Sequence, residues 1–114
     1  VLPWSNYAWS KLGGECAVQM YKNSLILRVC MTEKPFIHKY AFSNVKTNFI
    51  YHEDFVKLFL KLINKKGIFN IGGKTKTVFN FVKKENKNIK KKISKGEFPL
   101  NQDMNLTKLN KFIK

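Results

Sequence analysis

One continuous apolar run, residues 24–30 (SLILRVC), constrains the fold of this chain more than any other stretch. The run is bounded by polar residues and shows no alternation of apolar and polar positions, which is typical of a strand buried on both faces. The preceding segment, from about residue 7 to residue 21, carries apolar residues at helical spacing. A helix that leads into a buried strand through a short link is the unit from which parallel sheets covered by helices are built. The sequence therefore predicts an α/β fold.

The rest of the chain carries the signals of further helices and strands. Thr75 or Thr77 can cap one of the later helices, and Gly13-Gly14 is expected to let the first helix pack closely against a neighbour. Residues 31–48 are irregular and rich in aromatic side chains, which either help to form a ligand pocket or pack a small subdomain. Residues 85–95 are either a solvated connector or a small edge strand. Helices are predicted at 53–64, 77–84 and 105–113, and strands at 49–51 and 68–71.

The formal charge of +15 raises the question of an anionic partner. Arg28 is the only Arg among the 22 basic residues. Nucleic-acid-binding proteins use Arg for bidentate contacts to phosphate and guanine, which Lys cannot make. The chain is also rich in Asn, Ile and Phe, which an AT-rich coding sequence over-supplies. We therefore interpret most of the charge as compositional, and we do not expect a nucleic acid as the partner.

The sequence gives no sign of a disulfide, a metal site or a membrane segment. Cys16 and Cys30 are too few for a disulfide framework and are expected to be small buried hydrophobes. His38 and His52 have no further ligands at a metal-binding spacing, apart from the acidic residues next to His52. No stretch is apolar enough to span a membrane, and no signal-peptide core occurs at the start. We expect a cytoplasmic protein without a membrane partner.

Tyr7 and Lys11 are the residues with the clearest chemistry. They lie one turn apart on the first predicted helix, so the phenol and the ammonium share a face. A neighbouring cation favours the ionised form of a phenol, and a Tyr tuned in this way can pass a proton to or from a sugar or alcohol oxygen. In a chain this rich in Lys, the same spacing also arises by chance, as a solvated Lys above a half-buried Tyr. The spacing alone leaves both interpretations open.

Four stretches of the sequence occur in a suggestive order. Residues 3–15 contain Tyr-x-x-x-Lys followed by Leu-x-Gly-Glu, residues 25–28 read LILR, residues 67–73 read GIFNIGG, and residues 104–109 read MNLTKL. Together they resemble the C-terminal portion of an extended short-chain dehydrogenase/reductase. They are most similar to sugar-nucleotide reductases of the dTDP-4-dehydrorhamnose reductase type. The resemblance implies an extended Rossmann-type fold, in which residues 1–30 end the Rossmann domain and residues 31–114 form mainly the substrate-binding part.

The resemblance also implies a hydride transfer between NAD or NADP and a 4-keto nucleotide sugar. Tyr7 would be the general acid that protonates the ketone oxygen, and Lys11 would hold the nicotinamide ribose hydroxyls, so both would contact the cofactor. After the strand, Cys30 would lie near the nicotinamide and Met31 near the substrate. Arg28 would either contact the substrate or be a buried Arg satisfied by backbone carbonyls at the end of the sheet.

Two parts of the family's active site do not occur in this sequence. The Gly-rich turn that binds pyrophosphate and the Ser or Thr that joins the Tyr and Lys would both precede Val1 in a full-length relative. We therefore expect a fragment without the cofactor-binding half, inactive on its own. Residues 29–31 also replace the Ser/Thr and aromatic residues that such reductases tend to carry, which puts the identity of the substrate in doubt. Glu15 is expected to be structural.

Three alternatives stay open at this point. An epimerase or 4,6-dehydratase uses the same Tyr and Lys with a tightly held NAD. A small Lys-rich module could instead bind RNA or single-stranded DNA through Lys and aromatic side chains. A non-catalytic remnant could survive as a scaffold. The expected partner of the enzyme is a nucleotide-sugar substrate, and a homodimer is left open for the full-length protein.

Overall fold

A computed structural model of the protein describes residues 5–96 and 100–113. It contains both helices and short strands, which confirms the predicted α/β class. The helices are α1 (Asn6–Val18), α2 (His52–Leu62), α3 (Val78–Lys83) and α4 (Thr107–Ile113). The strands are β1 (Leu25–Val29), β2 (Met31–Thr32), β3 (Tyr40–Phe42), β4 (Lys46–Thr47), β5 (Ile50–Tyr51), β6 (Gly67–Ile71), β7 (Lys76–Thr77) and β8 (Lys90–Lys92).

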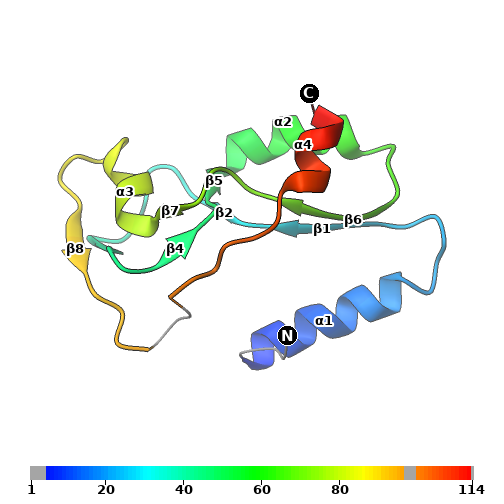
Figure 1. The fold of residues 1–114 in the computed structure, drawn as a ribbon, viewed down its shortest axis with the longest axis horizontal. Helices are drawn as coiled ribbons and strands as arrows, with labels where there is room; N and C mark the ends of the chain where they lie inside the picture. Colours follow the sequence, from blue (N-terminus) through cyan, green and yellow to red (C-terminus); the bar gives the residue numbers. More distant parts are fainter. Residues whose placement is uncertain (1–4, 97–99, 114) are drawn as a thin grey trace.

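A parallel pair of strands, β1 and β6, forms the longest sheet, with Leu25 opposite Gly67 and Val29 opposite Ile71. Helices α2 and α4 lie on one side of this pair, and α1 lies on the other (Figure 1). The side covered by α2 and α4 is closed by a hydrophobic cluster. Its buried members are Ile50, Leu62, Phe69, Ile71 and Leu109, with Leu25, Leu27 and Val29 packed against them. The predicted parallel pairing is therefore present, and the cluster joins the first 30 residues to the rest of the chain.

A second hydrophobic cluster lies at the other end of the molecule, among β3, β4, β7, β8 and α3 (Figure 1). Strands β3 and β8 are parallel, so part of the stretch at 85–95 is an edge strand. The hydroxyl oxygen of Thr77 accepts a hydrogen bond from the backbone N–H of Asn80 at 3.1 Å, which confirms Thr77 as a helix cap. The buried members of this cluster are Ala41, Val45, Val78, Phe79, Val82 and Ile89.

The described strands form four separate two-stranded sheets, and no clear Rossmann sheet is present among them. The prediction that the apolar run is buried on both faces is also wrong, because only Ile26 of β1 is buried and Arg28 is exposed. The face of β1 that carries Arg28 is turned towards α1, but α1 does not pack closely against the strand. No atom outside the helix lies within 4 Å of a Cβ built on Gly13 or Gly14, so the expected close packing there is absent.

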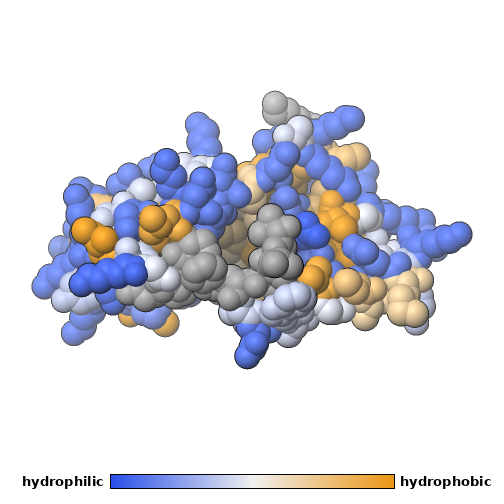
Figure 2. Space-filling view, turned by 60° about the horizontal axis from the view of Figure 1, so that its bottom comes forward, coloured by the Kyte–Doolittle hydropathy of each residue, from blue (hydrophilic) through white to orange (hydrophobic). Residues whose placement is uncertain are grey.

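Helix α1 contributes no buried residue. Cys16, expected to be buried, is exposed on it. The Cα radius of gyration is 15.4 Å, compared with about 13 Å for a compact domain of this length, in keeping with a helix that projects from the body. Hydrophobic patches are visible between hydrophilic surfaces in Figure 2. None of the helices among the described residues is long and apolar enough to cross a membrane.

A buried amide, Asn48, ties three separate segments together. Its Nδ2 donates to the carbonyl of Gly73 at 2.9 Å and to Oγ1 of Thr75 at 3.0 Å, and its Oδ1 accepts from the backbone N–H of Met104 at 2.8 Å. Only 1% of Asn48 is exposed. Gly72 lies so close to this residue that a Cβ built on it would be 2.6 Å from the Asn48 carbonyl oxygen. The absence of a side chain at Gly72 is therefore required by the packing around Asn48.

Alanine at two glycines should have opposite effects on stability. Gly72→Ala should lower the free energy of unfolding by about 2–3 kcal/mol, since backbone must move to admit the methyl group. Gly14→Ala, in the open interior of α1, should raise it by about 0.5–1 kcal/mol through helix propensity. Urea denaturation of both variants measures the difference. Equal effects of the two substitutions would contradict this account of the packing.

Candidate functional site

A groove of about 450 Å³ between α1 and β1 brings together most of the residues predicted to act on a ligand. Tyr7 and Lys11 line it from α1, Arg28 lines it from β1, and Met31 lines it from β2. These residues are separated by as much as 24 positions in the sequence. The structure therefore places the Tyr/Lys pair opposite the carboxyl end of β1. Pro3, at the start of the resembling stretch, lies outside the described residues.

Tyr7 and Lys11 are in direct contact on the same face of α1. The Lys11 Nζ lies 5.3 Å from the centroid of the Tyr7 ring, within the range of a cation–π interaction. Tyr7 is 71% exposed, so the picture of a half-buried Tyr beneath a solvated Lys does not apply. The phenol offers one O–H and the ammonium three N–H donors to a ligand in the groove. The pair is thus accessible and close enough to act together.

A bidentate ion pair holds this helix against the strand. Arg28 donates from Nε to Oε2 of Glu15 at 2.8 Å and from Nη2 to Oε1 at 2.7 Å. The hydrogen bonds from Arg28 lower the pKa of the Glu15 carboxyl, and those to Glu15 raise the pKa of the guanidinium. The expectation of a buried Arg satisfied by backbone carbonyls is wrong, because Arg28 is exposed and paired with a carboxylate. Glu15 is the partner of Arg28 in this ion pair, and its structural role stays a prediction.

Cys30 and Met31 diverge although they are adjacent in the chain. The Cys30 Sγ lies 3.0 Å from Oγ1 of Thr47, in hydrogen-bond contact. Cys30 does not line the groove that contains Tyr7, so no observed contact supports its predicted place near the nicotinamide. Met31 does line the groove and is 41% exposed. Of the two, Met31 is the residue that a ligand at Tyr7 could touch.

Met104 is a groove residue that the sequence did not reveal as one. Its backbone N–H is fixed by Asn48, which lies 56 positions earlier in the chain. The sequence assigned residues 104–109 only to the start of a helix, and no local periodicity reports so distant a contact. Met104 and Met31 together give the groove two flexible apolar side chains that can adapt to a ligand.

The aromatic stretch after β2 both packs the second cluster and lines a hollow. Phe36, Phe42 and Phe49 pack against the buried residues of that cluster. Together with His38 and Thr32 they line a hollow of about 300 Å³. Thr32 follows Met31 in β2, but this hollow and the groove at Tyr7 share no lining residue, because successive side chains of a strand point to opposite faces. Both predicted roles of the aromatic stretch, packing and lining a pocket, are compatible with this arrangement.

The groove offers donor groups of the kind that could hold one end of a nicotinamide dinucleotide. A hydroxyl and an ammonium one turn apart can bind the two hydroxyls of a ribose. The two Gly-Gly pairs of the chain do not form a site for the other end of such a cofactor, where its pyrophosphate lies. Gly72 and Gly73 are packed against the backbone of Asn48 and Phe49, which leaves no cradle for a pyrophosphate there. Gly13 and Gly14 lie inside α1 rather than in a turn before a helix.

The described part of the chain contains no group of three or more His, Cys, Asp or Glu side chains that could hold a metal ion. Comparisons of the chain with protein-family models, with curated proteins and with solved structures find no match. The interpretation of the groove therefore depends on its own residues and on the resemblance in the sequence.

The ion pair makes the stability of the protein depend on pH. Because the pKa of Glu15 is lowered in the folded state, its stabilising effect is complete above the ordinary value of 4.5 and is lost as the pH falls through the lowered pKa. Glu15→Gln should reduce the free energy of unfolding at pH 7 by about 0.5–1 kcal/mol, as expected for a pair that solvent still partly screens, with the Arg28 side chain 48% and the Glu15 side chain 19% exposed. The difference from the unsubstituted protein should be smaller at pH 3 than at pH 7.

Urea denaturation at both pH values tests this effect. Glu53→Gln is the matched control, since Glu53 makes only a 3.6 Å contact with Lys34 between two exposed side chains. A difference between the unsubstituted protein and Glu15→Gln that is the same at pH 7 and pH 3 would rule out the ion pair as its cause.

Proposed function

We propose that this chain carries the Tyr/Lys helix and the substrate side of an NAD(P)-dependent reductase of the short-chain dehydrogenase/reductase type. Its substrate would be a 4-keto sugar linked to a nucleotide. The observation that carries the proposal is the groove in which Tyr7, Lys11, Arg28 and Met31 meet. No Gly-rich turn of the dinucleotide-binding kind occurs in the 114 residues, so the proposal assigns to this chain no contact with the cofactor pyrophosphate.

In this mechanism the bound nicotinamide supplies the hydride. The Tyr7 hydroxyl donates its proton to the ketone oxygen, on which negative charge develops. The Lys11 ammonium, over the Tyr7 ring, stabilises the phenolate that remains after the transfer. Its N–H donors would also hold the ribose hydroxyls of the cofactor.

The other groove residues position this pair. The ion pair between Glu15 and Arg28 sets the distance of α1 from β1, and with it the width of the groove. Met31 and Met104 supply apolar surface next to the reacting carbon. These flexible thioether side chains would adapt to the part of the substrate next to the ketone.

The roles of Tyr7 and Lys11 can be tested in a protein in which this chain is joined to a dinucleotide-binding half. Tyr7→Phe should reduce turnover by about 10²–10⁴-fold, the usual contribution of a general acid, with little change in cofactor binding. Lys11→Met should reduce turnover and also weaken cofactor binding. The measurements are NADPH oxidation with a dTDP-linked 4-keto sugar and NADPH binding by fluorescence.

The chain offers matched controls for both substitutions. Tyr21→Phe and Lys22→Met remove the same groups from exposed positions just beyond α1, and both should leave turnover unchanged. Turnover of Tyr7→Phe equal to that of Tyr21→Phe would refute the catalytic role. Turnover without net NADPH consumption would point instead to an epimerase or a dehydratase.

A further inference from the structure

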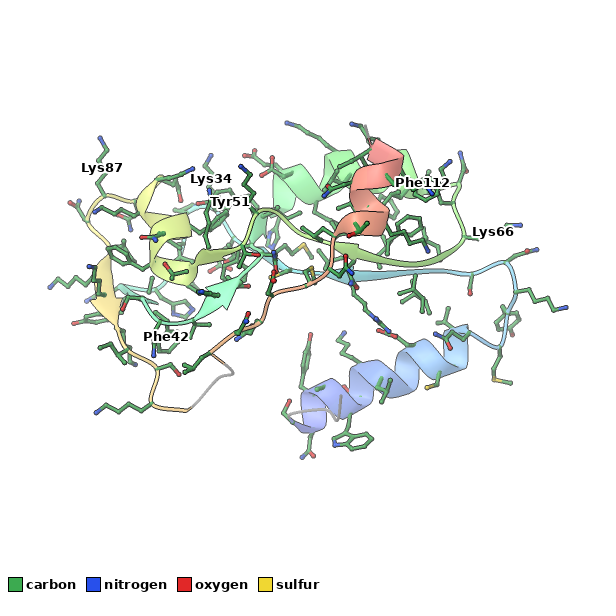
Figure 3. The ribbon with its side chains drawn as sticks, viewed as in Figure 1. Lys34, Phe42, Tyr51, Lys66, Lys87 and Phe112 are labelled. Carbon is green, nitrogen blue, oxygen red and sulfur yellow. The ribbon has the colours of Figure 1, made fainter. Side chains whose placement is uncertain are left out.

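The positive charge of the chain is concentrated in one stretch. Residues 74–95 contain nine lysines and one glutamate, a net charge of +8, whereas the whole chain carries +15. This stretch includes β7, α3 and β8, at one end of the molecule (Figure 1). Lys87 and Phe42 lie at this end, and Lys66 lies at the opposite end (Figure 3). A concentration of charge on one part of the surface favours an anionic partner there.

Strand β8 presents its charges beside aromatic side chains. It pairs with β3, with Tyr40 opposite Lys90 and Phe42 opposite Lys92. Opposite residues and alternate residues of paired strands share a face, so these four side chains lie on one face of the sheet. Ala41 points to the other face and is buried in the second hydrophobic cluster. The face that carries Tyr40 and the two lysines is therefore the outer one.

A hollow of about 320 Å³ lies next to this outer face. Tyr40 and Lys92 line it together with Phe36, His38 and Lys39, and no described carboxylate lines it. Half of Tyr40 is exposed, so its ring is accessible to a planar ligand. Aromatic rings flanked by cations are the means by which proteins bind single-stranded nucleic acids: the bases stack on the rings, and the cations contact the phosphates.

The lysines at this end repel one another and are not neutralised by acidic residues. Within residues 5–96 and 100–113, no ion pair joins Lys83 or the lysines of β8 to a carboxylate. Lys83 of α3 and Lys91 of β8 both lie over the ring of Phe79, with their Nζ atoms 5.6 and 5.1 Å from its centroid. A bound polyanion would relieve the repulsion between such like charges.

Lys108, at the other end, shows the contrast. It covers the edge of β6, where its Nζ donates to the carbonyl of Ile68 at 2.9 Å and lies 4.2 Å from the centroid of the Phe69 ring. Its ammonium is thus engaged inside the fold. All three lysines of β8 are exposed.

We propose that the outer face of β3 and β8 binds single-stranded nucleic acid without preference for its sequence. Lys39, Lys90 and Lys92 would contact the phosphates, and a base would stack on Tyr40. The scarcity of Arg argues against base-specific readout, but neutralising a phosphate backbone needs only positive charge, which Lys supplies. None of these residues lines the groove at Tyr7, so the proposal is independent of the proposed reaction.

A fluorescein-labelled oligo(U) of about 12 nucleotides is the probe, titrated with the 114-residue chain and followed by fluorescence anisotropy. Lys90→Gln with Lys92→Gln should weaken binding at least about tenfold and should reduce the slope of log Kd against log salt by about 1.4, since two phosphate contacts are lost. Tyr40→Leu keeps an apolar side chain on β3 but removes the ring. It should weaken binding about fivefold or more and leave the salt slope unchanged.

The controls remove the same groups elsewhere. Lys57→Gln with Lys61→Gln changes two exposed lysines of α2, which lies away from β8 (Figure 1), and Tyr21→Leu removes a ring that is 74% exposed. Both controls should change the affinity less than twofold. An equal loss in the β8 and α2 variants would show diffuse attraction to a basic protein and would overturn the proposal, as would failure to bind oligo(U) at about 50 mM salt.

Competition separates a nucleic acid from other anionic partners. Polyglutamate has the charge of a nucleic acid but no bases, and a duplex keeps its bases stacked inside, so both should displace the probe at least about fivefold less effectively than unlabelled oligo(U). Equal displacement by polyglutamate would assign the surface to an acidic protein. Equal displacement by phosphatidylserine vesicles at the same charge would assign it to a membrane surface, and either result would overturn the proposal.

Discussion

The paired hydrogen bonds between Glu15 and Arg28 determine where the candidate catalytic groups lie. Helix α1 contributes no buried side chain, so the hydrophobic effect does little to hold it in place. Within residues 5–96 and 100–113, this ion pair is the hydrogen-bonded link between α1 and the sheet. An ion pair that solvent partly screens, as here, contributes only about 1 kcal/mol. Helix α1 is therefore the element of the described chain that should separate from the body most easily.

The body itself depends on a different kind of constraint. Asn48 is nearly inaccessible to solvent, and its amide joins the turn after β6 to the segment before α4. Removing one partner of a buried amide leaves polar groups without hydrogen bonds, which costs more than the bond itself contributes. The wall of the groove that contains Met104 is consequently more firmly positioned than the wall that contains Tyr7. The site combines one fixed wall with one weakly held wall.

Local pattern predicted the elements of this fold well and their environment poorly. The helical stripes of α2 and α4 and the apolar runs of β1 and β6 are properties of neighbouring residues, and they appear where expected. The two-residue strands β2, β4 and β7 are too short to show any periodicity. Burial of β1 and of Cys16 was predicted wrongly, because burial depends on which distant segments pack there. Within the site, Tyr7 and Lys11 follow from spacing along one helix, whereas Met104 depends on a contact across 56 positions.

The position of Lys108 also affects how the sheet can grow. Unpaired carbonyl and N–H groups at a strand edge are templates for another strand, and a lysine at such an edge discourages pairing. Lys108 covers the edge of β6 at Ile68, and Asn70 binds the chain that runs alongside. Within the described residues, β1 pairs with β6 alone. A strand that extends this sheet would therefore join beside β1 rather than beside β6.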